Sequence, residues 1–259
     1  MENLASGLAE TRQPVLTLNK VCKNFGGVVA GKDITFDLFR GEIFGLIGPN
    51  GSGKTTLLNL VCGIYRTDSG TIRMMGRNIT NRPTHKIAKR GILRTFQHPR
   101  LLAGCDIRTN LIVGSDLAAR RGITGSSGRT ELLQELMLTA QLEHVNLDDS
   151  IEKLSYGQQK LLEIVRALLA EPDVLLLDEP AAGLNAREMD RVVALMNLAV
   201  DRDVAVLLIE HSMDLVMSVC HRITVLNFGQ QIASGTPSQI QSDPLVIEAY
   251  LGGDEDADD

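Results

Sequence analysis

One stretch of the chain has the residue types and spacing needed to hold phosphate groups. The segment Gly48-Pro-Asn-Gly-Ser-Gly-Lys54-Thr55-Thr56 matches the pattern G-x-x-x-x-G-K-[ST]. Its glycines allow a tight turn whose backbone N–H groups face inward around anionic oxygens. Lys54 can bring a positive charge to the β- and γ-phosphates of a nucleotide, and the Thr55 hydroxyl can ligate Mg²⁺. The predicted nucleotide contacts in this loop are Gly48, Pro49, Asn50, Gly51, Ser52, Gly53, Lys54, Thr55 and Thr56.

Two adjacent carboxylates supply a second chemical group. Asp178 and Glu179 directly follow the apolar run 174–177, which has the composition of a buried parallel strand. The carboxyl ends of such strands are where α/β sheets place their ligands. We therefore expect Asp178 to hold Mg²⁺ through its water shell and Glu179 to polarise an attacking water molecule.

Two further polar residues end neighbouring apolar runs. Gln97 follows the predicted strand 91–96, and His211 comes after the predicted strand 205–209. We expect His211 to face the same site as Asp178, and the Gln97 amide to reach the metal or the attacking water. Both would sense the γ-phosphate. The predicted catalytic residues are Lys54, Gln97, Glu179 and His211, and the predicted Mg²⁺ contacts are Thr55, Gln97 and Asp178.

Two other positions each allow two interpretations. Ser155 precedes a strong helical pattern over 158–169, with Gln158 in the reciprocal position of a capping box, so it could simply begin a helix. A helix N-terminus with Ser and Gly beside it is equally an anion site. Phe25, in a Phe-Gly-Gly turn ahead of the phosphate loop, could pack in the core or stack on an adenine ring.

The hydrophobic pattern predicts the elements that must position these side chains. A strand at 42–47 and a helix at 55–62 flank the phosphate loop, as that motif requires. Helical spacing dominates 106–170, apart from a glycine-rich loop at 120–129, and Asn185 with Glu188 caps a later helix. A final amphipathic piece spans 245–251. The remaining predicted strands are 15–18, 34–38, 71–74, 91–96, 174–177 and 205–209, with a hairpin over 223–233.

Composition narrows the class of protein. The chain has 259 residues, of which 44% are hydrophobic and 22% are charged, as in ordinary soluble globular proteins. No apolar run approaches the 18 residues of a membrane span, and we expect no signal peptide. The four cysteines lack metal-ligand spacing, and we expect reduced thiols. His221 lies in a polar turn and is expected to be structural.

Charge argues against nucleic acid as a partner. The net charge is −6, and five of the 32 acidic residues lie in 254–259, so the rest of the chain is nearly balanced against its 26 basic residues. Segment 82–100 is rich in basic residues, which could form a nucleic-acid patch. A solvated helix face is the commoner explanation, and no interleaved aromatic residues support base stacking.

The order of these motifs resembles that of ATP-binding-cassette (ABC) ATPases over about residues 15–252. The stretch Leu154-Ser-Tyr-Gly-Gln158 is similar to the signature that separates this family from other P-loop proteins. Finer features resemble the ATP-binding subunit of branched-chain amino acid importers. Those features are Arg94-Thr-Phe-Gln-His98, Ala181-Ala-Gly-Leu-Asn185, Ile209-Glu-His211, Val225-Leu-Asn-Phe-Gly229 and Glu248-Ala-Tyr-Leu251.

The resemblance implies an α/β fold: a P-loop NTPase (RecA-like) core with an antiparallel β subdomain and an inserted α-helical subdomain. The polar composition of 1–13 predicts a flexible leader, and the run of acidic residues predicts a disordered tail at 253–259. The resemblance implies an ATPase domain at 14–252 between them. Within the domain, the core takes 14–96 and 167–252, and the helical subdomain takes 97–166.

The resemblance also implies a head-to-tail dimer that binds ATP and Mg²⁺. Each ATP would lie between the P-loop of one subunit and the signature of the other, so the signature residues would act in trans. The dimer would contain two copies or one copy plus a related ATPase. The signature residues concerned are Ser155, Tyr156, Gly157 and Gln158.

Outside the dimer, the implied partners are transmembrane permease subunits and, indirectly, a periplasmic or extracellular solute-binding protein. The implied place is peripheral, on the cytoplasmic face of the inner or plasma membrane. The implied function is to power the uptake of branched-chain or related amino acids.

Two departures and two alternatives accompany this interpretation. Asn185 stands where most of the wider family has Asp, and Ser212 stands where these importer subunits usually have Asp; we expect Ser212 to be a helix cap. One alternative is a soluble ABC ATPase with no role in transport. The other is a P-loop kinase, which would leave 154–158 without a function.

Overall fold

The computed structural model describes residues 12–122 and 126–251. The predicted leader and acidic tail therefore fall largely outside the described residues. A six-stranded sheet organises the fold, in the order β10-β9-β3-β8-β7-β6. Its members are β3 (Ile43–Ile47), β6 (Ile92–Arg94), β7 (Val174–Asp178), β8 (Ala205–Ile209), β9 (Arg222–Asn227) and β10 (Gln230–Gly235). All neighbours are parallel except the β9–β10 hairpin.

The central strands are parallel because both of their faces are covered. Every residue of β3, β7 and β8 is buried, which explains their continuous apolar runs in the sequence. One side packs against helices and contributes to a core with Leu161, Leu195 and Val216. The other side packs in a second core with Leu57, Leu58 and Leu18. This arrangement confirms the α/β class.

A smaller antiparallel sheet has the order β2-β1-β4-β5. Its strands are β1 (Leu16–Phe25), β2 (Val28–Leu38), β4 (Ser69–Met74) and β5 (Arg77–Asn78). The first two are longer than the alternation at 15–18 and 34–38 predicts, because the hairpin continues through exposed residues to its turn. Helix α1 (Lys54–Val61) buries its apolar side chains between the two sheets.

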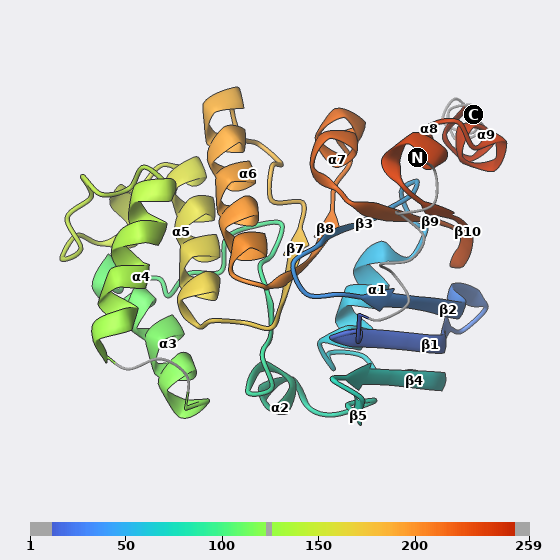
Figure 1. The fold of residues 1–259 in the computed structure, drawn as a ribbon, viewed down its shortest axis with the longest axis horizontal. Helices are drawn as coiled ribbons and strands as arrows, with labels where there is room; N and C mark the ends of the chain where they lie inside the picture. Colours follow the sequence, from blue (N-terminus) through green and yellow to red (C-terminus); the bar gives the residue numbers. More distant parts are fainter. Residues whose placement is uncertain (1–11, 123–125, 252–259) are drawn as a thin grey trace.

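Apart from α1 and the short α2, the helices gather in two places in Figure 1. The helices α3 (Ile107–Arg120), α4 (Ser126–Thr139), α5 (Tyr156–Leu169) and α6 (Ala186–Asp201) form a group beside β7. The shorter helices α7 (Met213–Val219), α8 (Pro237–Gln241) and α9 (Pro244–Leu251) lie near β9 and β10, while α2 (Thr84–Ala88) adjoins the antiparallel sheet. A 3-10 turn, η1 (Ile151–Lys153), precedes α5. Within 12–122 and 126–251, no helix combines the length and apolarity of a membrane span.

Two predicted boundaries need correction. The loop predicted at 120–129 ends earlier, because α4 already begins at Ser126. Leu132 and Leu136 of this helix are buried in the main core, and such packing outweighs the weak helix propensity of Ser and Gly. The strand predicted at 91–96 is only Ile92–Arg94, so Gln97 lies three residues beyond the strand rather than directly at its end.

Candidate active site

The phosphate loop joins β3 to α1 in a conformation that depends on its glycines. Gly48 and Gly53 have φ values of 149° and 104°. A Cβ atom at Gly48 would lie 2.0 Å from the Leu226 carbonyl oxygen, and one at Gly53 would lie 2.2 Å from that of Ala30. Both positions therefore require glycine for conformation and for space.

Lys54 begins α1 and turns back over this loop. Its Nζ donates to the carbonyl oxygens of Gly48, at 2.7 Å, and Pro49, at 3.0 Å. Burial lowers the pKa of the Lys54 ammonium, while the negative charges of Glu179 and Asp178 oppose that effect. The Lys54 charge is therefore electrostatically coupled to the two carboxylates predicted from the sequence.

Glu179 lies between two polar side chains from different segments. The Gln97 Nε2 is 2.7 Å from one of its carboxylate oxygens, and the His211 Nε2 is 2.9 Å from the other. The three residues follow β6, β7 and β8, which are adjacent parallel strands, so their carboxyl ends meet at one edge of the sheet. The structure thus brings together Gln97, Glu179 and His211, as the strand-end argument predicts.

The backbone of Glu179 is unusual. Its φ of 49° lies in the left-handed region, which costs roughly 1–2 kcal/mol for a residue with a side chain. The Glu179 N–H donates to the Ile209 carbonyl oxygen at 2.9 Å, which continues the β7–β8 pairing past Asp178. Strained backbone of this kind is often found at functional sites.

Asp178 is buried and paired with an arginine. Arg94 donates from Nη2 to Asp178 Oδ2 at 2.6 Å, and from Nη1 to Asn59 Oδ1 at 2.6 Å. Both partners of this ion pair are almost fully buried. Arg94 therefore differs from the rest of the basic segment 82–100, where Arg82, His85 and Lys86 are exposed.

Comparison with known proteins identifies the family to which this site belongs. The family model for ABC transporters matches residues 31–182, which is more than half of the chain. The chain belongs to the ABC transporter family. A second family model, described as branched-chain amino acid ATP-binding cassette transporter, matches residues 230–256 of this ABC-family chain.

Curated relatives match the ABC-family chain over nearly its whole length. The high-affinity branched-chain amino acid transport ATP-binding protein LivG of Escherichia coli is 39% identical over 255 residues, covering 93% of this chain and 98% of the relative. The corresponding protein BraF of Pseudomonas aeruginosa is 40% identical over 251 residues, with the same two coverages. The chain and these relatives therefore have closely similar lengths.

Solved structures show the same fold. The ADP conformation of MJ1267, an ATP-binding cassette of an ABC transporter, superposes with a TM-score of 0.80 at 30% identity, over 93% of this chain and 99% of MJ1267. A nucleotide-free ATP-binding cassette from an ABC transporter gives a TM-score of 0.79 at 29% identity, over 92% and 99% of the two chains. The P-loop NTPase fold expected from the resemblance is confirmed.

The signature segment of this ABC-family chain begins α5. The Ser155 hydroxyl accepts from the Gln158 N–H at 3.2 Å, and the Gln158 side chain accepts from the Ser155 N–H at 2.9 Å. The predicted capping box is therefore present. Capping leaves the anion interpretation open, because Ser155 is exposed at a helix N-terminus. In Figure 1, α5 and α1 lie on opposite sides of β7 and β8.

Several other side chains have positions that distinguish between the interpretations open to them. Phe25 is 43% exposed and contacts Tyr65 edge-on at 5.3 Å between ring centroids, so it lies outside the core. The His221 Nδ1 accepts from the Ile43 N–H at 3.0 Å, as expected of a structural histidine. Ser212 and Asn185 both cap helices, α7 and α6 respectively.

Sequence reasoning missed two buried residues beside the site. Lys160 of α5 is 2% exposed, and its Nζ donates to the Glu179 carbonyl oxygen at 2.6 Å. Glu210 accepts from the N–H groups of Ala181 and His211, at 2.7 and 3.2 Å. Burial raises the pKa of the Glu210 carboxyl, and these hydrogen bonds oppose it. A lysine within the apolar face of a predicted helix was the available signal for Lys160.

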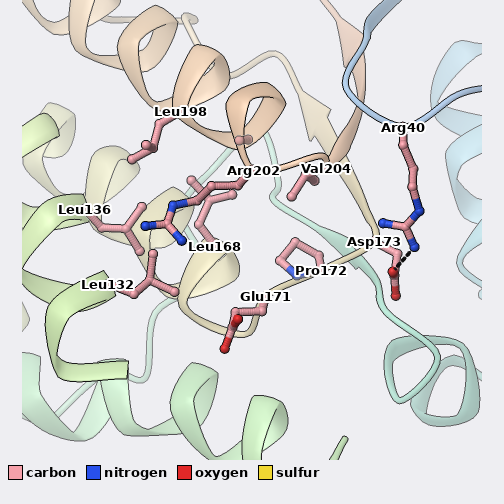
Figure 2. Close-up of a pocket in the computed structure, with 11 residues that line it drawn as sticks. Arg40, Leu132, Leu136, Leu168, Glu171, Pro172, Asp173, Leu198, Arg202 and Val204 are labelled. Atoms are coloured by element: carbon pink, nitrogen blue, oxygen red, sulfur yellow. Dashed lines mark hydrogen bonds and ion pairs between the residues drawn. The ribbon is translucent and has the colours of Figure 1, made fainter. Parts of the chain in front are cut away.

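A separate hollow of about 220 Å³ lies between α4, α5 and α6. Figure 2 shows its lining, with Leu132, Leu136 and Leu168 on one side and the ion pair of Arg40 with Asp173 on the other. Asp173 directly precedes β7, whereas Glu179 follows it. The hollow is therefore at the opposite edge of the sheet from the candidate active site.

Proposed function

We propose that this ABC-family chain hydrolyses ATP with Mg²⁺ to power the uptake of branched-chain or related amino acids through separate membrane subunits. The observation that carries the hydrolytic part is the placement of Glu179 between Gln97 and His211, beside the buried Asp178. Three adjacent strand ends supply these groups at the edge where α/β folds bind ligands.

Each residue has a role that its surroundings support. The P-loop amides and Lys54 hold the phosphates, and Phe25 stacks on the adenine from the exposed end of β1. Glu179 accepts a proton from the attacking water, while the side chains of Gln97 and His211 orient the two carboxylate oxygens of Glu179. Phosphoryl transfer needs little else from a protein beyond positioning and charge stabilisation.

The residues present fit a magnesium ion. Thr55 is exposed at the start of α1, and Asp178 and Gln97 carry the oxygen atoms that Mg²⁺ prefers. The Arg94 ion pair uses Asp178 Oδ2, which leaves the other carboxylate oxygen for the water shell of the metal. When bound, Mg²⁺ would neutralise charge that develops on the transferred phosphoryl group.

The second half of each ATP site comes from a partner. Ser155, Tyr156, Gly157 and Gln158 begin α5, away from the chain's own P-loop, and would contact an ATP held by a second ATPase subunit. Subunits of ABC transporters act with membrane permeases, so the proposed place is the cytoplasmic face of the membrane. A solute-binding protein would deliver the amino acid on the other side.

Similar curated proteins support branched-chain amino acids as the transported solute. Several similar curated proteins are described as branched-chain amino acid transport ATP-binding proteins, in two bacteria and in Archaeoglobus fulgidus. The match over residues 230–256 points to the same group.

The test has two parts. Purified chain should release phosphate from ATP with Mg²⁺ and no added acceptor, and EDTA should abolish the release; a requirement for an acceptor would indicate a kinase instead. A tagged chain should also co-purify with permease subunits from detergent-solubilised membranes of its source. Failure to recover any membrane subunit, despite ATPase activity, would indicate a cassette with no role in transport.

A further inference from the structure

The proposed function leaves one buried lysine without a role. Lys160 lies on the second turn of α5, and its ammonium donates to two carbonyl oxygens, those of Glu179 at 2.6 Å and Pro180 at 3.3 Å. Burying an amine is unfavourable unless it is hydrogen-bonded or paired, so these contacts account for its place in the fold. Both acceptors belong to the segment directly after Asp178.

The Glu179 backbone is held from both sides. Its N–H donates to Ile209 of β8 and its carbonyl oxygen accepts from Lys160 of α5, across a residue with left-handed φ. A sparsely populated conformation persists only where the surroundings hold it in place. Lys160 therefore helps to fix the direction in which the Glu179 side chain extends from the backbone.

Tyr156, one turn before Lys160, contacts the other side of the same site. Its hydroxyl donates to the Gln97 carbonyl oxygen at 3.2 Å, and its ring lies 5.7 Å from the Lys160 ammonium. The Gln97 side chain in turn donates to Glu179. Tyr156, Gln97, Glu179 and Lys160 thus form a closed ring of contacts between α5 and the strand ends.

We propose that Lys160 and Tyr156 are positioning residues for Glu179 and Gln97, so that the signature helix also shapes the hydrolytic site of its own chain. The inference rests on the proposed ATPase function. It gives α5 two tasks: its N-terminal residues would serve the partner's ATP, while Lys160 and the hydroxyl of Tyr156, which is hydrogen-bonded to the Gln97 carbonyl oxygen, act in cis.

The main test is Lys160→Met, which keeps an unbranched side chain of nearly the same length and removes the hydrogen-bond donor. We expect kcat for ATP hydrolysis to fall about 10- to 100-fold, the effect of a small misplacement of a reacting group, with KM for ATP within about twofold of wild type. Lys160→Arg, which retains a donor, should restore most of kcat. Lys153→Met is the matched control, since Lys153 is exposed in η1 and pairs only with Asp149 among the described residues.

Tyr156→Phe tests the same ring of contacts independently of Lys160. It removes one oxygen from a side chain that is 40% exposed, so the protein should fold even if Lys160→Met does not. We expect a smaller fall in kcat, about 2- to 10-fold, as for the loss of one hydrogen bond, again with little change in KM.

The outcomes separate the two proposals. If wild type and Lys153→Met hydrolyse ATP and both ring variants match them in kcat, the positioning role is wrong and the ATPase function stands. A parallel loss of kcat, ATP affinity and thermal stability would also overturn the positioning role, because it would show a general folding defect. If wild type with Mg²⁺ hydrolyses no ATP, the proposed function itself fails.

Discussion

Among single residues, Glu179 has the most constrained surroundings. Its carboxylate is hydrogen-bonded to two side chains. Its backbone N–H and carbonyl groups are hydrogen-bonded to Ile209 and Lys160. A carboxylate fixed in this way would need little reorganisation to act as the proposed general base. The strained φ of this residue is consistent with selection for position rather than for stability.

Replacing Glu179 tests the role of its carboxylate. Glu179→Gln keeps the shape of the side chain and one accepting oxygen but removes the base. We expect turnover to fall about 10²–10⁴-fold while MgATP binding is retained, since the phosphate loop is unchanged. Steady-state ATPase rates together with equilibrium nucleotide binding are the measurements. Wild-type turnover in this variant would remove Glu179 from the mechanism.

A second residue-scale prediction concerns a buried thiol. Burial raises the pKa of Cys62 to about 11, against the opposing effect of Arg94. Because the thiol pKa is higher in the folded state than in the unfolded state, where it is near 9, the protonated thiol contributes fully to stability below pH 9. That contribution is lost as pH rises toward 11. Relative to Cys62→Ala, wild type should therefore lose unfolding free energy between pH 9 and pH 11.

Urea unfolding midpoints measured across that pH range provide the check. The other groups that titrate there are shared by wild type and Cys62→Ala, so their effects cancel in the difference. A difference in free energy that stays constant from pH 9 to pH 11 would contradict the buried, protonated thiol.

Residue identity predicts some of the site and not the rest. The P-loop glycines, Asp178, Glu179 and His211 can be found because each lies at a fixed offset from a strand or helix with a clear apolar pattern. The contacts of Lys160 and Arg94 cannot be predicted, because they depend on how α5 and α1 are placed against β7. A lysine in the apolar face of a predicted helix marks Lys160 as unusual, but the sequence does not say which groups it contacts.

At the scale of elements, strand prediction is most accurate where burial is complete. The runs 174–177 and 205–209 correspond to β7 and β8 within one residue. The start of α4 is missed because a polar, glycine-rich stretch near it resembles a loop, while the decisive apolar residues come a turn later. The division into a core and a helical subdomain at 97–166 stays a prediction.

The segment from Gln97 to α3 is the expected coupling element. Gln97 is hydrogen-bonded to Glu179 through its side chain and to Tyr156 through its carbonyl oxygen, so it contacts both the proposed general base and α5. Beyond it the chain continues into α3, which packs against α5. A residue in this place can transmit the state of the γ-phosphate to a whole group of helices.

Gln97→Ala should separate coupling from chemistry. We expect transporter-stimulated ATPase to fall more than the basal ATPase of the isolated subunit, because stimulation requires the helical group to respond to the site. Both rates are measured with wild type as reference, the stimulated one in membranes with the permease subunits. Equal losses in the two assays would mean that Gln97 acts only in catalysis.

For the whole molecule, the main question is whether one chain contains a complete ATP site. Lys54 begins α1 and Ser155 precedes α5, and Figure 1 shows these helices separated by β7 and β8. The exposed N-terminus of α5 could receive a γ-phosphate, but from an ATP bound to another copy. Two copies arranged head to tail would then form two composite sites.

Mixing two inactive variants tests this arrangement. Lys54→Ala removes the positive charge that contacts the phosphates in one half-site. Ser155→Arg blocks the other half-site with a bulky side chain. In a mixed dimer, the intact P-loop of the Ser155→Arg subunit faces the intact signature of the Lys54→Ala subunit, so one of the two sites is complete. We expect each variant alone to be inactive and the mixture to recover part of the wild-type ATPase rate. Subunits with different tags allow the mixed dimers to be isolated before assay, and mixed dimers that form but stay inactive would show that the composite site is wrong for this chain.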